Sequence, residues 1–152
     1  MENKYQYIVI EGNIGAGKTS LTQAFCQKYN TLGLYEQFSD NPFLPLFYEN
    51  PARFALQLEL TFLLDRIRQQ NNDLKNTLFH QGIVADYYLK KSMIFAAETL
   101  TDEEFKLYGR IYSELTGNMP QPDLCIFLHQ TPQQLLKNIA KRGRTYESNI
   151  SE

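Results

Sequence analysis

The residues with the clearest chemical potential form a glycine-rich segment early in the chain. In the pattern Gly-x-x-x-x-Gly-Lys-Thr, the glycines let successive backbone N–H groups point inward and form a nest for an anion. A helix that begins directly after them adds partial positive charge at the same place. We expect Lys18 to bridge the β- and γ-phosphates of ATP and the Thr19 hydroxyl to bind Mg²⁺. The segment that predicts this ATP site reads Gly12-Asn13-Ile14-Gly15-Ala16-Gly17-Lys18-Thr19.

Two carboxylates come directly after predicted strands, where the crevice of a parallel sheet lies. Glu36, in Tyr-Glu-Gln-Phe, could accept a proton from a substrate hydroxyl that attacks the γ-phosphate. The alternative for Glu36 is a solvated loop glutamate. Asp86 ends an apolar strand and could hold Mg²⁺ directly or through water. Its alternative role is the N-cap of the next helix.

A dense cluster of charge stands near the end of the chain, as Arg142-Gly-Arg144-x-x-Glu147. Two guanidinium groups two residues apart suit the neutralisation of phosphoryl oxygens during transfer. The alternative is a solvated basic helix end, because cations are common at helix C-termini. The chain has no Asn-Lys-x-Asp motif, which disfavours a GTPase.

Apolar, strand-like segments alternate with helical ones along the chain. Pro42 and Pro51 stand where helices could begin, Thr101 is suited to cap a helix, and Thr131-Pro132 begins another. Continuously apolar strands between helices predict an α/β fold of the three-layer P-loop NTPase type, with a parallel sheet and helices on both faces. The expected strands are 5–11, 32–35, 82–86 and 123–128, and the expected helices are 18–29, 51–75, 89–100, 102–115 and one from 132 into the arginine cluster.

Composition is that of an ordinary soluble globular protein, with 152 residues, 43% apolar and 21% charged. The formal charge of −2 argues against a dedicated nucleic-acid binder. Cys26 and Cys125 are isolated and are expected to be buried free thiols, and His80 and His129 lack metal-ligand spacing. No apolar run could span a bilayer and no signal-peptide pattern opens the chain, so we expect a cytoplasmic protein with no membrane partner.

Taken together, the motifs make the chain similar to the deoxynucleoside kinase family. The matching pieces begin with the phosphate loop, Glu36 and the run Asn-Pro-Phe-Leu at 41–44, followed by Phe-Tyr48. They continue with Arg66 on the long helix, with Ile-Phe-Ala at 94–96 and with the arginine cluster. The resemblance spans nearly the whole chain. The Asn-Pro-Phe-Leu run most resembles bacterial deoxyadenosine and deoxyguanosine kinases.

The resemblance implies transfer of the ATP γ-phosphate to the 5′-hydroxyl of a deoxynucleoside, with a preference for purines. It also implies a homodimer formed through long helices. The residue roles that it implies are the general base for Glu36, contact with the 3′-hydroxyl for Tyr48 and Glu147, phosphate contact for the lid residues Arg142 and Arg144, and a place near the base pocket for Arg66.

The segment after the third predicted strand departs from the family pattern. Family members usually have Asp-Arg-Ser or Glu-Arg-Ser there, whereas this chain reads Asp86-Tyr-Tyr. The acidic residue is kept and the arginine is absent. We expect Lys90 or Lys91 to replace the missing charge.

A second departure concerns the base-reading glutamine of the family, which aligns with Glu59. An ionised carboxylate can only accept hydrogen bonds, so Glu59 would favour bases with an exocyclic amino group over thymine. Burial would change this if it protonated the side chain and restored a donor. Gln57 becomes the base reader instead if the helix is rotated.

Three functions remain open from the sequence. The first is a deoxynucleoside kinase with a single domain, 1–152. By comparison with the family pattern, we expect this domain to be truncated after the lid segment that contains Arg142 and Arg144. The second is a thymidylate-type nucleoside monophosphate kinase, which would need extra positive charge for the phosphate of its acceptor. The third is a non-catalytic nucleotide-binding fragment.

Overall fold

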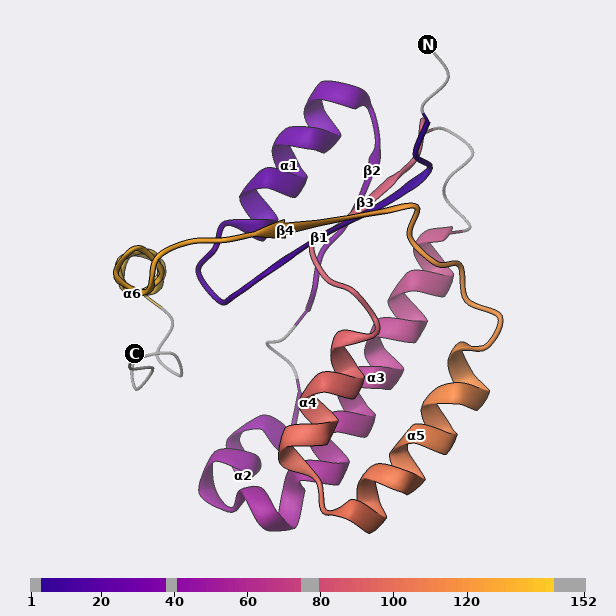
Figure 1. Ribbon diagram of the computed structural model, residues 1–152, viewed down its shortest axis with the longest axis vertical. Helices are drawn as coiled ribbons and strands as arrows, with labels where there is room; N and C mark the ends of the chain where they lie inside the picture. Colours follow the sequence, from indigo (N-terminus) through magenta and orange to yellow (C-terminus); the bar gives the residue numbers. More distant parts are fainter. Residues whose placement is uncertain (1–3, 38–40, 75–79, 144–152) are drawn as a thin grey trace. The chain divides into compact units, whose positions relative to one another are not determined.

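The computed structural model describes residues 4–37, 41–74 and 80–143. The chain divides into two compact units. The phosphate-loop unit consists of Met1–Tyr35, His80–Tyr87 and Pro122–Glu152, and the helical unit consists of Glu36–Phe79 and Tyr88–Gln121. Figure 1 shows a sheet in the first and a group of helices in the second. Each unit has its own core.

The phosphate-loop unit is built on a four-stranded parallel sheet in the order β2-β3-β1-β4. Strand β1 is central, and its Val9 lies between Ala85 on one neighbouring strand and Cys125 on the other. Val9 is fully buried, as are Leu34 and Val84, so apolar side chains hold the middle of the sheet out of water. The strands are Tyr7–Gly12 (β1), Leu32–Leu34 (β2), Ile83–Ala85 (β3) and Leu124–Leu128 (β4).

Two helices belong to this unit, α1 (Lys18–Tyr29) and α6 (Pro132–Arg142). Helix α1 starts directly from the phosphate loop and packs on β1, β2 and β3. The Thr131 side chain caps α6 by accepting a hydrogen bond from the Gln134 N–H, and Gly143 ends it in the left-handed conformation at φ 69°. A threonine cap with proline after it and a glycine at the end are standard helix limits, which is why the sequence predicts this helix.

The helical unit contains α2 (Phe43–Glu49), α3 (Pro51–Leu74), α4 (Lys91–Thr99) and α5 (Asp102–Thr116). Helices α3, α4 and α5 pack side by side (Figure 1). A reciprocal capping box between Thr101 and Glu104 starts α5, because each side chain bonds the backbone N–H of the other. The core that the three helices share consists of Leu63, Ile67, Leu89, Ala96 and Tyr108.

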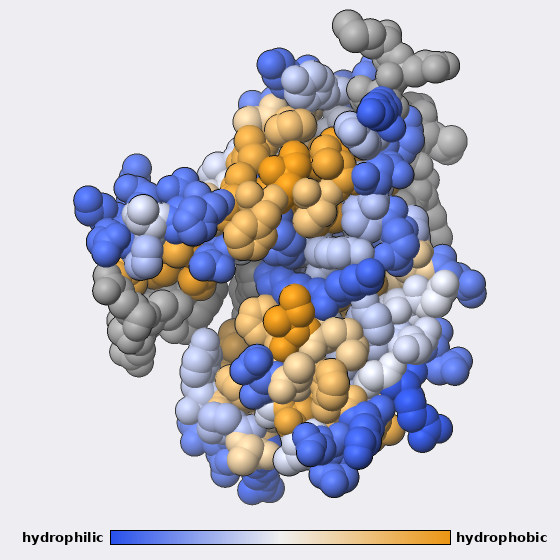
Figure 2. All heavy atoms as spheres, viewed as in Figure 1, coloured by the Kyte–Doolittle hydropathy of each residue, from blue (hydrophilic) through white to orange (hydrophobic). Residues whose placement is uncertain are grey.

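The predicted parallel α/β fold is confirmed, and most predicted limits hold to within two residues. One expectation is wrong. Cys125 is exposed, because β4 is an edge strand and its alternate side chains, Cys125 and Phe127, point away from the core. Figure 2 shows apolar side chains gathered on the visible face over this sheet. Within the described ranges, none of the helices combines the length and the apolar character needed to cross a membrane.

Candidate active site

The phosphate loop connects β1 to α1 and depends on glycine at specific points. Gly15 and Gly17 have φ values of 78° and 95°, in the left-handed region that side chains other than glycine rarely adopt. A Cβ atom on Gly15 would also lie 2.9 Å from the carbonyl oxygen of Leu135. Glycine therefore serves both the turn and the close approach of α6 to the loop.

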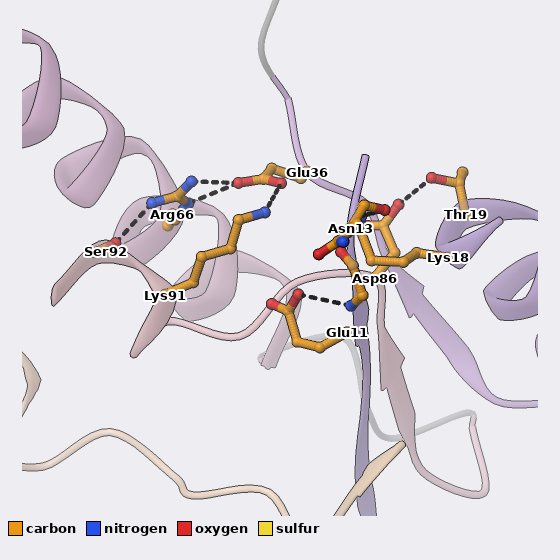
Figure 3. Close-up of polar contacts among 10 residues, drawn as sticks. Glu11, Asn13, Lys18, Thr19, Glu36, Arg66, Asp86, Lys91 and Ser92 are labelled. Atoms are coloured by element: carbon orange, nitrogen blue, oxygen red, sulfur yellow. Dashed lines mark hydrogen bonds and ion pairs between the residues drawn. The ribbon is translucent and has the colours of Figure 1, made fainter. Parts of the chain in front are cut away.

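Lys18 and Thr19 open α1 with their polar groups at the loop (Figure 3). The Lys18 ammonium donates to the carbonyl oxygens of Gly12 at 2.8 Å and Asn13 at 3.1 Å. The Thr19 hydroxyl donates to Asp86 Oδ2 at 2.5 Å. The predicted phosphate-binding lysine and the two predicted magnesium ligands thus lie in one unit, and the structure brings the two ligands into contact.

The environment of Asp86 fits a carboxylate that serves a metal better than it fits a helix cap. Asp86 is 4% exposed, and its N–H donates to the carbonyl oxygen of Leu34 on the neighbouring strand. Helix α4 begins only at Lys91, so the N-cap alternative is wrong. One carboxylate and one hydroxyl suit Mg²⁺, which is commonly bound by one or two protein oxygens together with substrate phosphates. The described residues contain no group of three or more acidic, His or Cys side chains for an all-protein site.

Asn138 on α6 fixes that helix to the phosphate loop, a contact that sequence reasoning missed. Its side-chain amide donates to the carbonyl oxygen of Gly15 at 2.7 Å. The only signal in the sequence was an amide on one side of an amphipathic helix. Arg142 is the last residue of the same helix and is exposed there. Arg144 and Glu147, the other predicted members of the lid, lie outside the described residues.

Glu36 is the centre of a buried ionic network in the helical unit (Figure 3). Its carboxylate is 3% exposed, which excludes the solvated-loop alternative. Arg66 donates to Oε1 through Nε at 2.9 Å and also through Nη2, while the Lys91 ammonium donates to Oε2 at 3.1 Å. Ser92 holds the guanidinium in turn, because its hydroxyl accepts from Arg66 Nη1 at 2.7 Å.

The two cations determine the charge of Glu36. Burial alone would raise the pKa of this carboxyl, but Arg66 and Lys91 together outweigh burial and hold the pKa below its ordinary value. Glu36 is therefore ionised at neutral pH and can accept a hydrogen bond from a hydroxyl group. Of the two lysines that the sequence offered, Lys91 contacts Glu36, whereas the Lys90 ammonium lies 5.8 Å from the centre of the Tyr88 ring.

Glu59 is also buried, but its carboxyl group has a raised pKa, unlike that of Glu36. It is 5% exposed, and it accepts one hydrogen bond, from the Thr99 hydroxyl to Oε1 at 3.4 Å. Burial raises its pKa to about 7, against smaller opposing effects of Arg66 and Thr99. This raised pKa favours the protonated alternative for Glu59 over the ionised form that the sequence first suggested. Gln57 is exposed, so α3 turns Glu59 inward and not Gln57.

Tyr48 is an exposed residue in the described structure. Its side chain is on α2 and is 61% exposed, with its ring edge-on to Phe47 at 5.9 Å between centroids. Arg66, expected near a base pocket, bonds Glu36 and Ser92. Sequence reasoning missed Ser92 entirely, because a serine in the first turn of a helix carries no distinctive signal.

Known proteins resemble this chain both in sequence and in fold. The family model described as "Deoxynucleoside kinase" matches residues 8–152. The deoxyguanosine kinase of Bacillus subtilis is 39% identical over 153 residues, which cover 97% of this chain and 72% of that protein. The deoxyadenosine kinase of Lactobacillus acidophilus is 34% identical over 149 residues, which cover 93% of this chain and 69% of that protein. The deoxyadenosine kinase of M. mycoides with bound dCTP has the same fold, with a TM-score of 0.76 at 23% identity over 95% of this chain and 75% of that one.

Proposed function

We propose that this chain, which belongs to the deoxynucleoside kinase family, transfers the γ-phosphate of ATP to the 5′-hydroxyl of a purine deoxynucleoside. The observation that supports the proposal best is the state of Glu36. Carboxylates are rarely buried and charged without a purpose, because desolvation is costly even when cations compensate for it. An ionised, oriented acceptor at the end of a strand region suits a group that receives a hydroxyl proton.

The proposed reaction needs one proton acceptor and several phosphate contacts. The oxygen of the 5′-hydroxyl forms a bond to the γ-phosphorus while its proton passes to a Glu36 oxygen. The bond between the γ-phosphorus and the bridging oxygen breaks, and ADP leaves. Phosphoryl transfer has a loose transition state, so orienting the hydroxyl matters more than a strongly basic carboxylate. A lowered pKa at Glu36 is therefore compatible with its role.

We assign the phosphates of ATP to the phosphate-loop unit. Backbone N–H groups of the loop, Lys18 and the start of α1 would hold them. When bound, Mg²⁺ would neutralise phosphate charge from a site at Thr19 and Asp86. Arg142 and Arg144 are proposed to contact the transferring group, and Tyr48 and Glu147 the 3′-hydroxyl, on the strength of the family resemblance.

The purine preference rests on the names of the relatives and on Glu59. The matched proteins are called deoxyguanosine and deoxyadenosine kinases, and a carboxyl in place of the glutamine suits bases that carry an amino group. A thymidylate-type acceptor fits less well, because it needs cations for a second phosphate. Arg66 and Lys91 are already bonded to Glu36.

The location and the oligomeric state complete the proposal. A homodimer through the long helices is supported by exposed apolar side chains on these elements, namely Leu64 on α3, Ile94 and Phe95 on α4, and Leu107 on α5. We also propose a cytoplasmic location, where ATP and nucleosides are available. Light scattering coupled to gel filtration would check the dimer, and a monomer at all concentrations would contradict it.

The test is a transfer assay with labelled ATP and deoxyguanosine, deoxyadenosine, thymidine and thymidylate as acceptors. Glu36→Gln should keep nucleotide-dependent thermal stabilisation and lower turnover by ~10²-fold or more, the usual scale for a lost general base. Glu114→Gln changes an exposed glutamate on α5 and serves as the matched control. Transfer to thymidylate but not to nucleosides would replace the proposal with the monophosphate kinase, and binding without transfer would leave a nucleotide-binding module.

A further inference from the structure

The peptide group between Gly15 and Ala16 is held at both of its polar ends. Its carbonyl oxygen, that of Gly15, accepts from the side-chain amide of Asn138 at 2.7 Å, across 123 positions of the chain. Its N–H, that of Ala16, donates to the carbonyl oxygen of Asn13 at 3.0 Å. The peptide therefore cannot rotate within the phosphate loop without losing both hydrogen bonds.

The surface of α6 fits this part of the loop closely. A Cβ atom on Gly15 would lie 3.1 Å from Ile139 Cγ1 and 3.6 Å from the Cβ of Asn138. Ile139 is itself only 7% exposed. Together with Leu135, these residues stand three and four positions apart, a spacing that puts them on one face of a helix. One face of α6 thus supplies both the packing and the hydrogen bond to the loop.

A second amide on α6 determines how the Asn138 side chain is turned. Gln134 Nε2 donates to Asn138 Oδ1 at 2.9 Å from one helical turn earlier. Because a carboxamide carries an acceptor at one end and donors at the other, this bond at the oxygen leaves the nitrogen facing Gly15. The Gln134 N–H in turn donates to the Thr131 hydroxyl that caps α6. A line of hydrogen bonds therefore runs from the start of the helix to the phosphate loop.

We propose that Asn138 is a positioning residue for ATP, which sets the Gly15 peptide of the phosphate loop from α6 with its amide oriented by Gln134. The inference rests on the proposed function, in which this loop holds the phosphates. It assigns part of the affinity for the nucleotide to a residue outside the loop motif.

The electrostatics of an anion nest explain why this peptide has to be held. Such a nest binds phosphate through N–H groups that point inward, so a carbonyl oxygen that turned inward would place partial negative charge against the anion. Lys18 bonds the carbonyl groups of Gly12 and Asn13. Asn138 does the same for Gly15 from the side of α6. A loop that is already ordered loses less conformational freedom when the nucleotide binds, which raises its affinity.

The experiment measures the Kd of ATP and of ADP, each with Mg²⁺, by calorimetry. We expect Asn138→Ala to raise both values by about fivefold or more, the scale of one lost hydrogen bond. Alanine favours a helix more than asparagine does, so a weakened α6 would not be the cause. Gln133→Ala is the matched control, because it removes an exposed amide from the same helix. Unchanged affinities in Asn138→Ala would overturn the inference.

A double-mutant cycle tests whether Gln134 acts through Asn138. Gln134→Met keeps the length of the exposed side chain and removes its donor, so the Asn138 amide is no longer held in one orientation. This change should weaken ATP binding in the unchanged chain and have no further effect in Asn138→Ala. Equal effects in the two backgrounds would overturn the orienting role of Gln134.

Kinetics separate a role in phosphate binding from a general effect on the structure. In Asn138→Ala the KM for ATP should rise while the KM for deoxyguanosine stays unchanged. Equal rises in both would show a merely structural role and overturn the inference. Weaker binding of ATP with unchanged binding of ADP would also overturn it, because the effect would then lie at the γ-phosphate and not at the loop.

The unchanged chain distinguishes failure of this inference from failure of the proposed function. If it binds neither ATP nor ADP, both the proposed function and the inference are wrong. If it binds both nucleotides and transfers phosphate, and Asn138→Ala does so equally well, the inference alone is contradicted.

Discussion

The Lys91 ammonium lies 3.1 Å from Glu36 Oε2, although the two residues are 55 positions apart in the chain. Lys91 is the first residue of α4, and its carboxylate partner is bonded on its other oxygen by Arg66 from α3. The proposed general base is thus held between two helices by one cation from each. Its orientation and its charge depend on the packing of α3 against α4.

Replacing Lys91 with methionine should shift the pH dependence of kcat/KM. Lys91 lowers the pKa of Glu36, so its loss raises that pKa and moves the acid limb of the profile to higher pH. Activity should fall most at the acid end of the profile, and Lys91→Arg should restore the limb because it restores the charge. Lys90→Met is the matched control, since Lys90 bonds no carboxylate in the described structure. An unmoved acid limb in Lys91→Met would mean that Lys91 does not set the ionisation of Glu36.

Replacing Lys18 with alanine should abolish stabilisation of the chain by ATP. Its ammonium lies against the carbonyl groups of the loop, 2.8 Å from that of Gly12, where it is placed to meet the β- and γ-phosphates. A bound nucleotide at 100 times its Kd stabilises by about 2.7 kcal/mol, and this increment should disappear. Thermal unfolding with and without ATP and Mg²⁺ measures it, with Lys28→Ala, at the far end of α1, as control. An unchanged shift in Lys18→Ala would contradict the phosphate-loop assignment.

Replacing Asp86 with asparagine should weaken the response to magnesium selectively. The substitution removes the buried carboxylate that accepts from Thr19 but keeps its size. We expect the Mg²⁺ concentration for half-maximal activity to rise by about tenfold, a typical loss for a weakened metal site. Stabilisation by ATP in the presence of EDTA should stay close to that of the unchanged chain. Equal magnesium titrations for Asp86→Asn and the exposed control Asp65→Asn would remove Asp86 from the metal site.

The free energy of unfolding should reveal the raised pKa of Glu59. Because its folded pKa of about 7 exceeds the ordinary value, the protonated form is favoured in the folded state. This contribution is present below about pH 4.5 and is lost as the pH rises through 7. Glu59→Gln should therefore be more stable relative to the unchanged chain at pH 8 than at pH 5, by on the order of 2 kcal/mol.

Urea unfolding at the two pH values tests this difference, with Glu114→Gln as the control for an exposed glutamate. Equal effects of Glu59→Gln at both pH values would show that Glu59 does not titrate between them.

Short stretches of sequence were sufficient to predict the features that depend on neighbouring residues alone. The phosphate loop is eight consecutive residues whose glycines allow the left-handed turns that other residues rarely adopt, and Thr101 with Glu104 forms its capping box within one helical turn. Alternation of continuously apolar strands with capped helices predicted the parallel sheet, because such strands need helices to cover both of their faces. The loop and the helix caps arise from conformational preferences and hydrogen bonds that span only a few residues.

The chemical state of the site was decided by tertiary structure. The sequence could not choose between Lys90 and Lys91, because both stand at the start of the same helix and only packing turns one toward Glu36. It also could not predict that Arg66 binds a carboxylate 30 positions away, or that burial raises the pKa of Glu59 to about 7. Charge and pKa in a core depend on the solvent excluded and the ions brought near, and both follow from contacts between distant parts of the chain.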